Sequence, residues 1–124
     1  MLFRSVKVRK NVLPKMEQEL GPGIRDALSR SAQLLRDDAD ALDNLAKEFW
    51  DHDKSLAIEE LTKLSKAVRT RVLRLALFES GISQLSAEQV AQVEALISNW
   101  KGQGEVSLPS GVKVSRISGR LTLS

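Results

Sequence analysis

The amino-acid sequence predicts an α+β fold that is mainly helical, with a long connecting helix followed by a small helical domain that ends in a three-stranded antiparallel meander. No glycine or proline interrupts the chain between Ile24 and Gly81, so helix is expected to dominate that region. After Gly104 the apolar residues alternate with polar ones, which is typical of strands. Helices followed by strands are the pattern of an α+β architecture.

The first expected helix begins near Ile24 and carries one long apolar stripe. Its members recur at spacings of three, four or seven residues: Ile24, Leu28, Leu35, Leu42, Leu45 and Phe49. At 1.5 Å per residue such a helix would run about 40 Å. This length exceeds what a small core needs, so it favours a rod between domains or a helix that packs against another chain.

A turn is expected at residues 51–55, which lack apolar side chains, and a new helix is expected to start near Ser55. Ser65 can cap a further helix that ends before Gly81. One stripe of that helix is expected to be buried, formed by Val68, Val72, Leu75, Ala76 and Glu79.

A capping box, Ser86 followed by Gln89, predicts the start of the last helix. Its buried face is expected to comprise Val90, Val93, Ile97 and Trp100. The alternating residues after Gly104 are separated by turn signals at 109–111 and 118–119, which predicts the three strands. A meander of this size needs a helix against one face to be stable.

The composition excludes several classes of site. The chain has 124 residues, no cysteine and one histidine, so neither a disulfide framework nor a dedicated zinc site is expected, and no metal ligand is proposed. His52, among aspartates in the expected turn, is interpreted as a solvated surface residue. No apolar run could span a bilayer and no secretory signal is visible, so a cytoplasmic protein without membrane contact is expected.

The formal net charge is +3, but the basic residues are unevenly placed. Lys66, Arg69, Arg71 and Arg74 lie within nine residues, and four such cations repel one another unless an anion or acidic neighbour is present. One interpretation is contact with nucleic-acid phosphates. The alternative is surface ion pairing, for which the expected partners are Glu59, Glu60 and Glu79.

Two further groups of residues extend these alternatives. Lys113 and Arg116 on the meander could enlarge a phosphate-binding patch, with Lys101 and Arg120 beside them. Trp50 and Trp100 could stack on bases, although both continue apolar stripes, which favours core packing.

Four segments of the sequence, residues 8–14, 27–40, 67–74 and 104–114, are together similar to one known family. They resemble the tRNA(Ile)-lysidine synthase family from the end of its catalytic domain onward, over nearly the whole chain. Residues 8–14 are similar to the family's basic stretch that ends in valine, leucine and proline. Residues 27–40 resemble its connecting helix, and residues 67–74 resemble the arginine-rich helix of its substrate-binding domain. Residues 104–114 resemble the hairpin that closes that domain.

The resemblance implies a division into residues 1–22 as the tail of a catalytic domain, 23–54 as the connecting helix and 55–124 as a tRNA substrate-binding domain. It also implies a C-terminal fragment, since the family's Ser-Gly-Gly-x-Asp-Ser loop for ATP has no counterpart in these residues. The family's enzyme uses ATP and lysine to convert the wobble cytidine of an isoleucine tRNA to lysidine. The chain alone is expected to be inactive and to bind no cofactor, whereas ATP and magnesium are expected for the full-length enzyme.

The resemblance also suggests roles for particular residues. Arg9 would complete the edge of the catalytic site, and the arginines of 66–74, with Lys113 and Arg116, would hold tRNA phosphates. The expected partners are isoleucine tRNA and the catalytic domain. The rival hypothesis is a helical module without nucleic-acid binding of its own, which either forms a homodimer through the Ile24 to Phe49 stripe or joins domains.

Overall fold

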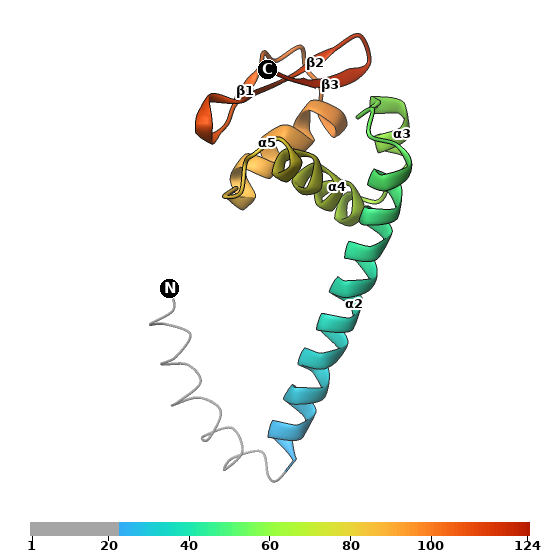
Figure 1. The fold of residues 1–124 in the computed structure, drawn as a ribbon. Helices are drawn as coiled ribbons and strands as arrows, with labels where there is room; N and C mark the ends of the chain where they lie inside the picture. Colours follow the sequence, from blue (N-terminus) through green and yellow to red (C-terminus); the bar gives the residue numbers. More distant parts are fainter. Residues whose placement is uncertain (1–22) are drawn as a thin grey trace. The chain divides into compact units, whose positions relative to one another are not determined.

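The computed structural model describes residues 23–124, and these confirm the α+β fold (Figure 1). Four α-helices are followed in this part of the chain by a three-stranded sheet. The chain separates into two compact units, residues 1–40 and 41–124. The second unit contains the hydrophobic core and the cationic side chains of α4.

Helix α2 runs from Ile24 to His52 as one continuous element of 29 residues, as the absence of glycine and proline predicted. Its predicted apolar stripe is buried only at its C-terminal end, where Ala46 and Trp50 enter the core. Leu35 is 70% exposed, so the first part of the stripe is left uncovered within residues 23–124. Amphipathic periodicity identifies a face, but it does not say what covers that face.

The helix after the turn, α3, spans Ile58–Thr62 and so begins three residues later than Ser55. Residues before it are held by the sheet, because the carbonyl of Leu56 accepts a hydrogen bond from the amide of Leu121 at 3.1 Å. Leu56 also adopts a left-handed backbone with φ of 55°. A residue with these contacts cannot continue a helix, which explains the late start.

Helix α4 runs from Lys66 to Glu79. Its predicted N-cap is confirmed, because the Ser65 side chain accepts a hydrogen bond from the amide of Val68 at 3.3 Å. Gly81 follows the helix with φ of +95°, a conformation that suits glycine after a helix end. The predicted stripe is partly wrong, since the buried residues of α4 are Val68, Val72, Leu73, Ala76 and Leu77.

Helix α5, Ala87–Ser98, starts with the predicted capping box. The Gln89 amide donates to the Ser86 hydroxyl at 3.1 Å, and the Ser86 amide donates to the Gln89 side chain at 2.9 Å. The prediction for Trp100 is wrong, because this residue lies beyond the end of α5 and is 40% exposed.

The meander consists of β1 (Val106–Ser107), β2 (Lys113–Ile117) and β3 (Arg120–Leu123), paired antiparallel in that order. Ser118 and Gly119 between β2 and β3 both have positive φ, the geometry that two-residue hairpin turns require. Val114 pairs with Leu123, and Arg116 pairs with Leu121. The predicted meander is therefore confirmed.

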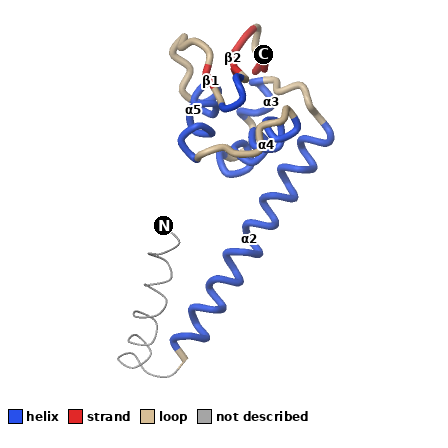
Figure 2. The backbone as a smooth tube through the Cα atoms, turned by 60° about the vertical axis from the view of Figure 1, so that its left-hand side comes forward, coloured by secondary structure: helices blue, strands red, loops and turns tan. Residues whose placement is uncertain are grey.

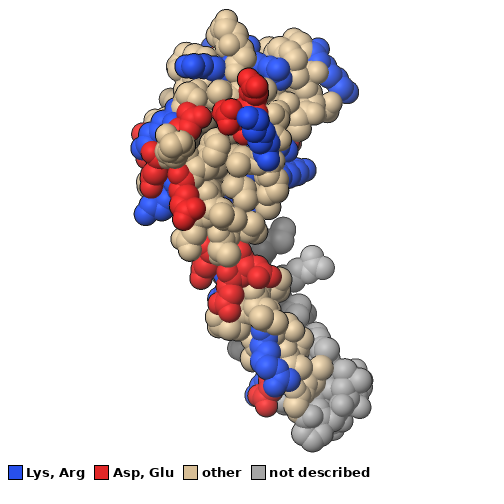
Figure 3. Space-filling view, turned by 90° about the vertical axis from the view of Figure 1, so that its right-hand side faces the viewer, with Lys and Arg blue, Asp and Glu red and all other residues tan. Residues whose placement is uncertain are grey.

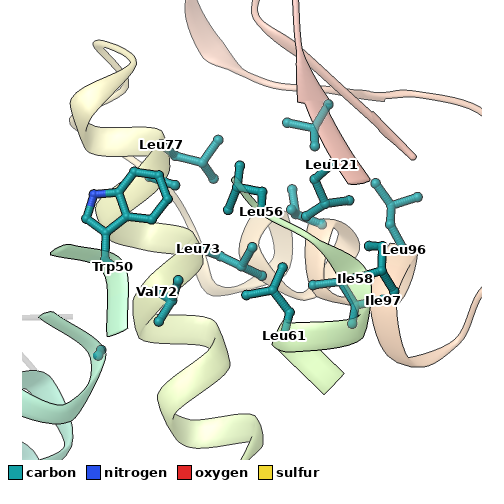
Figure 4. Packing of buried hydrophobic residues seen from close by; sticks show 14 of the residues in the cluster. Trp50, Leu56, Ile58, Leu61, Val72, Leu73, Leu77, Leu96, Ile97 and Leu121 are labelled. Atoms are coloured by element: carbon teal, nitrogen blue, oxygen red, sulfur yellow. The ribbon is translucent and has the colours of Figure 1, made fainter. Parts of the chain in front are cut away.

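Within the second unit, α5 lies between the sheet and α4 (Figures 1 and 2). Leu61 of α3 and Leu73 of α4 are almost completely buried near the middle of the core, and Leu56 and Leu121 approach from the sheet side (Figure 4). Trp50 closes the core at the end of α2. The sheet thus gains the helical cover that a small meander needs.

Candidate functional site

Arg69 and Arg71, the two arginines of α4 that are nearest to each other in the sequence, lie on different sides of the helix. At about 100° per residue, Arg71 and Arg74 are some 60° apart around the axis, whereas Arg69 is turned well away from both. Arg74 is exposed, but Arg69 is oriented toward the core. The structure therefore does not bring the predicted cluster together as one site.

Arg69 forms a buried ion pair with Glu94 of α5. Its Nε lies 2.9 Å and its Nη2 2.8 Å from Oε1 of Glu94, and the two side chains are only 11% and 6% exposed. Its Nη1 donates to the carbonyls of Leu64 at 3.0 Å and Leu61 at 3.4 Å. Because these donors are used inside the protein, Arg69 holds α4 to α5 and α3, and we exclude it from the candidate phosphate contacts.

The partner of Arg69 was missed by sequence reasoning, although a signal was present. Glu94 lies four residues after Val90 and three before Ile97, within the buried stripe of α5. A carboxylate that is buried at such a position needs a cation beside it to offset the cost of burying its charge. This signal, with the position of Arg69 four residues before Leu73, could have identified the pair.

Arg71 and Arg74 instead line a groove in the second unit, which we call the α2–α4 groove. It has a volume of about 840 Å³. Its walls come from the end of α2, the outer side of α4 and the loop before α5: Asp43, Asn44, Ala46, Lys47, Arg71, Arg74, Leu75, Phe78, Ile82, Ser83, Gln84, Leu85 and Ser86. The groove combines cationic groups with an apolar floor.

The charges of the groove are not balanced. The Asp43 carboxylate is bound by Nε of Arg71 at 2.7 Å. Arg74 and Lys47 are exposed and make no ion pair within residues 23–124, although Arg74 donates a long hydrogen bond of 3.5 Å to the carbonyl of Leu85. These two cations are therefore available to an anion from outside.

The remaining predicted cations lie elsewhere. Lys66, at the first turn of α4, is exposed and unpaired within the described part of the chain. Lys113 pairs with Glu105 at 3.4 Å, and its position in β2 puts it on the opposite face of the sheet from Arg116. Arg116 donates to the carbonyl of Leu96 at 3.0 Å and lies 5.1 Å from the centre of the Trp100 ring.

Two of the three carboxylates that were expected to pair with the arginines bind lysines instead. Glu60 binds Lys63 at 3.1 Å, and Glu79 binds Lys54 at 3.3 Å. The pKa of Glu79 is lowered, first by the side chain of Trp50 and then by Lys54. The buried Trp50 indole nitrogen nevertheless has no partner that meets the distance and angle limits of a hydrogen bond.

The face drawn in Figure 3 shows basic and acidic side chains interspersed rather than one continuous basic field. Binding of a polyanion by this chain would therefore depend on local groups such as the groove. No cluster of metal-binding side chains occurs in residues 23–124, where His52 is exposed. None of the helices in that range is long and apolar enough to cross a membrane. Arg9 lies outside the described residues.

Comparison with known proteins identifies relatives of this chain. Residues 56–122 match the family described as the TilS substrate binding domain. The chain is 46% identical to a tRNA(Ile)-lysidine synthase of Leifsonia xyli, over 97% of its own length and 38% of that protein. It is 42% identical to the enzyme of the same name in Streptomyces coelicolor, over 94% of its length and 35% of that protein.

A third relative extends the likeness to another organism. The tRNA(Ile)-lysidine synthase of Thermobifida fusca is 40% identical, over 95% of this chain and 38% of that protein. The chain thus spans little more than a third of the length of these relatives, and it corresponds to a C-terminal part of them. With the substrate-binding unit matched over residues 56–122, the chain belongs to the tRNA(Ile)-lysidine synthase family.

Proposed function

We propose that this chain holds the tRNA substrate of a tRNA(Ile)-lysidine synthase through contacts between exposed cations of α4 and backbone phosphates. The observation that carries the proposal is the state of Lys66 and Arg74, which are both exposed and without a carboxylate partner in residues 23–124. Both lie within the matched substrate-binding unit. Unpaired cations on a rigid helix suit phosphate contacts, which position an RNA without reading its sequence.

The local electrostatics of α4 support the same role. The first turn of this helix has no acidic residue, so the positive end of its dipole adds to the charge of Lys66. Arg71 contributes from the groove, although its pairing with Asp43 reduces what it can offer an external phosphate. Lys113 and Arg116, on other surfaces and with partners of their own, are assigned no primary role.

In the full-length protein, the tRNA held here would be presented to the site that uses ATP and lysine to convert the wobble cytidine of isoleucine tRNA to lysidine. That chemistry needs ATP and magnesium, which we place outside residues 23–124. The role of the present chain is to hold the body of the tRNA while the reacting base is held elsewhere. Such an enzyme would work in the cytoplasm, where its tRNA is found.

A salt series tests the proposal directly. Binding of the chain to an isoleucine tRNA transcript is measured at several salt concentrations for the wild type and for the double variant Lys66→Gln/Arg74→Gln. Two lost phosphate contacts are expected to weaken binding and to make the slope of log affinity against log salt shallower by roughly 1.5–2. The matched control is Lys113→Gln/Arg120→Gln, which removes the same charge from the meander.

The comparison between the two double variants decides the outcome. The proposal requires the α4 variant to lose more affinity and more slope than the meander variant. Equal losses would show a diffuse electrostatic attraction with no special role for α4. No measurable binding by the wild type at low salt would contradict a tRNA-holding role for this chain.

A second candidate function is a dimerisation or interdomain module, and one observation favours it. Leu34 and Leu35 on the first part of α2 are 64% and 70% exposed, which leaves apolar surface open to a partner. Light scattering tests a homodimer of this chain. A mass that stays monomeric at high protein concentration would exclude self-association.

A further inference from the structure

We propose that the α2–α4 groove binds one or two unpaired nucleotides of the bound RNA, with a base lying on the Phe78 ring and its phosphate at Arg74 and Lys47. This inference rests on the proposed tRNA-holding function and extends it from phosphate contact to recognition of an unpaired segment. Four features of the groove support it: an exposed aromatic ring, its spacing from the arginines, the charge balance and the size.

Phe78 is an aromatic side chain that the core does not explain. It is 65% exposed, whereas its neighbour Leu77 is 2% exposed. Its place on α4, four residues after Arg74 and seven after Arg71, puts all three side chains along one side of the helix. The ring and the cations therefore line the same groove.

Aromatic rings beside cations are the combination by which proteins bind single-stranded nucleic acid. Bases stack on the ring, and positive groups follow the phosphates. Leu75 and Leu85, both half-buried, add apolar surface near the ring. A base in this position would cover Phe78 and part of this floor, so the exposed apolar surface would gain a partner.

The charge balance of the groove selects an anionic occupant. Its three cations face a single carboxylate, Asp43, and Arg71 already binds that group at 2.7 Å. An apolar helix from another protein would cover Arg74 and Lys47 without supplying an anion, which is costly for charged groups. A nucleotide supplies both the flat apolar face and the negative charge.

The size of the groove and the position of the ring favour an unpaired segment over a duplex. A volume of about 840 Å³ falls in the range of roughly 300–1,000 Å³ that holds small organic ligands, and a nucleotide is of that size class. A paired base is stacked within its helix and cannot lie on Phe78 without leaving it. Single-stranded loops and ends have no such restriction.

The test compares two RNA probes and two matched variants of the full chain. The probes are a fluorescent six-nucleotide oligouridine and a blunt RNA hairpin whose twelve-pair stem is closed by a chemical linker in place of loop nucleotides. Phe78→Leu removes the aromatic face but keeps an apolar side chain. Trp100→Leu makes the same kind of change at an exposed aromatic residue outside the groove.

If the groove binds unpaired nucleotides, Phe78→Leu weakens oligouridine binding by roughly tenfold, the loss expected for one stacked base, and leaves the salt slope unchanged. Arg74→Gln is expected to weaken the same binding and to reduce the slope by roughly one. Trp100→Leu should have no effect on oligouridine. Circular dichroism melting of each variant confirms that the fold is retained.

Several results would overturn the inference while leaving the tRNA-holding proposal intact. One is that Phe78→Leu changes nothing although Lys66→Gln/Arg74→Gln still weakens tRNA binding. Another is that Phe78→Leu weakens the hairpin as much as the oligouridine, which would exclude stacking of an unpaired base. A third is that neither RNA probe binds in the groove, whereas an acidic helical peptide binds there and saturates it. That result would assign the groove to a protein partner.

Discussion

The two sides of α4 carry the same residue type under opposite conditions. On the core side, Arg69 is bound to the buried Glu94 at 2.8 Å and to the carbonyl of Leu64. On the groove side, Arg71 binds a carboxylate that is 64% exposed, and Arg74 has no carboxylate within residues 23–124. Arginine thus holds helices together on the core side of α4 and leaves an exposed positive charge on the groove side. Position around the helix axis, and not composition, decides which arginine is held in the core and which stays exposed.

The largest expected loss of stability comes from breaking the buried ion pair of Arg69, and it is compared with breaking the exposed ion pair of Arg71. Glu94→Ala leaves Arg69 buried without its anion, which should lower the free energy of unfolding by about 3–5 kcal/mol. Asp43→Ala removes the partner of Arg71 in exposed surroundings and should cost less than about 1 kcal/mol. Urea denaturation of both variants measures the difference.

A double variant sharpens this prediction. Arg69→Met/Glu94→Leu replaces the buried pair by apolar side chains of similar size and should recover most of the stability lost in Glu94→Ala. Similar losses in Glu94→Ala and Asp43→Ala would contradict the contrast between the core side and the groove side. Glu94→Gln, which keeps the shape but leaves one acceptor oxygen for Arg69 and Ser98 together, serves where Glu94→Ala fails to fold.

Adjacent residues give the next comparison. Leu77 is 2% exposed and Phe78 is 65% exposed. Leu77→Ala should cost about 2–5 kcal/mol of unfolding free energy, because it removes buried groups and leaves a cavity. Phe78→Ala should change stability by less than about 0.5 kcal/mol, as surface changes usually do. Thermal melting of the two variants measures this, and equal losses would place Phe78 in the core.

The sequence predicted the local features of the fold well. The Ser65 and Ser86 caps, the glycine after α4 and the strand order of the meander were all expected, because caps, turns and alternation are local signals. Lys66 and Arg74 were predicted only as members of one cationic cluster, and the structure leaves these two exposed, while their phosphate contacts stay a prediction.

What the sequence did not predict depends on contacts between distant segments. Arg69 meets Glu94 across 25 residues, and the α2–α4 groove brings Lys47 near Arg74 across 27 residues. The late start of α3 likewise results from Leu56 pairing with Leu121 of the sheet. Helical periodicity alone predicted Leu75 and Glu79 on the buried face of α4 and omitted Leu77. In a short helix that also carries arginines, the apolar residues are compatible with two different buried faces.

A smaller loss of stability is expected at Ser86, which contributes both to the groove and to a core helix. Ser86 lines the groove and also caps α5, which packs in the core. Ser86→Ala removes the hydroxyl that accepts from the Gln89 amide and should cost about 1 kcal/mol. Ser83→Ala, which lines the groove without capping a helix, is the control. An equal loss in both variants, measured by urea denaturation, would show that the cap contributes nothing.

The smallest expected effect concerns pH and the turn that joins α2 to α3. The pKa of Asp53 is lowered from its ordinary value of 3.8, mainly because its carboxylate accepts hydrogen bonds from Ser55. A carboxyl whose pKa is lower in the folded state stabilises the fold fully above its unfolded pKa, and this contribution is lost as the pH falls through the lowered folded value.

Asp53→Asn should therefore lower the urea midpoint slightly at pH 7. The effect should become smaller as the pH falls and the wild-type carboxyl is protonated. Asp51→Asn, two residues earlier at the exposed end of α2, is the matched control. It should not show this pH dependence, because the amide of Ser55 donates to Asp53. The acid sensitivity of this turn would then be separate from the Arg69–Glu94 pair on the core side, whose loss affects stability far more. An Asp53→Asn effect that grows as the pH falls would contradict the assigned direction, because protonation of the wild-type carboxyl can only remove what the charged form contributes.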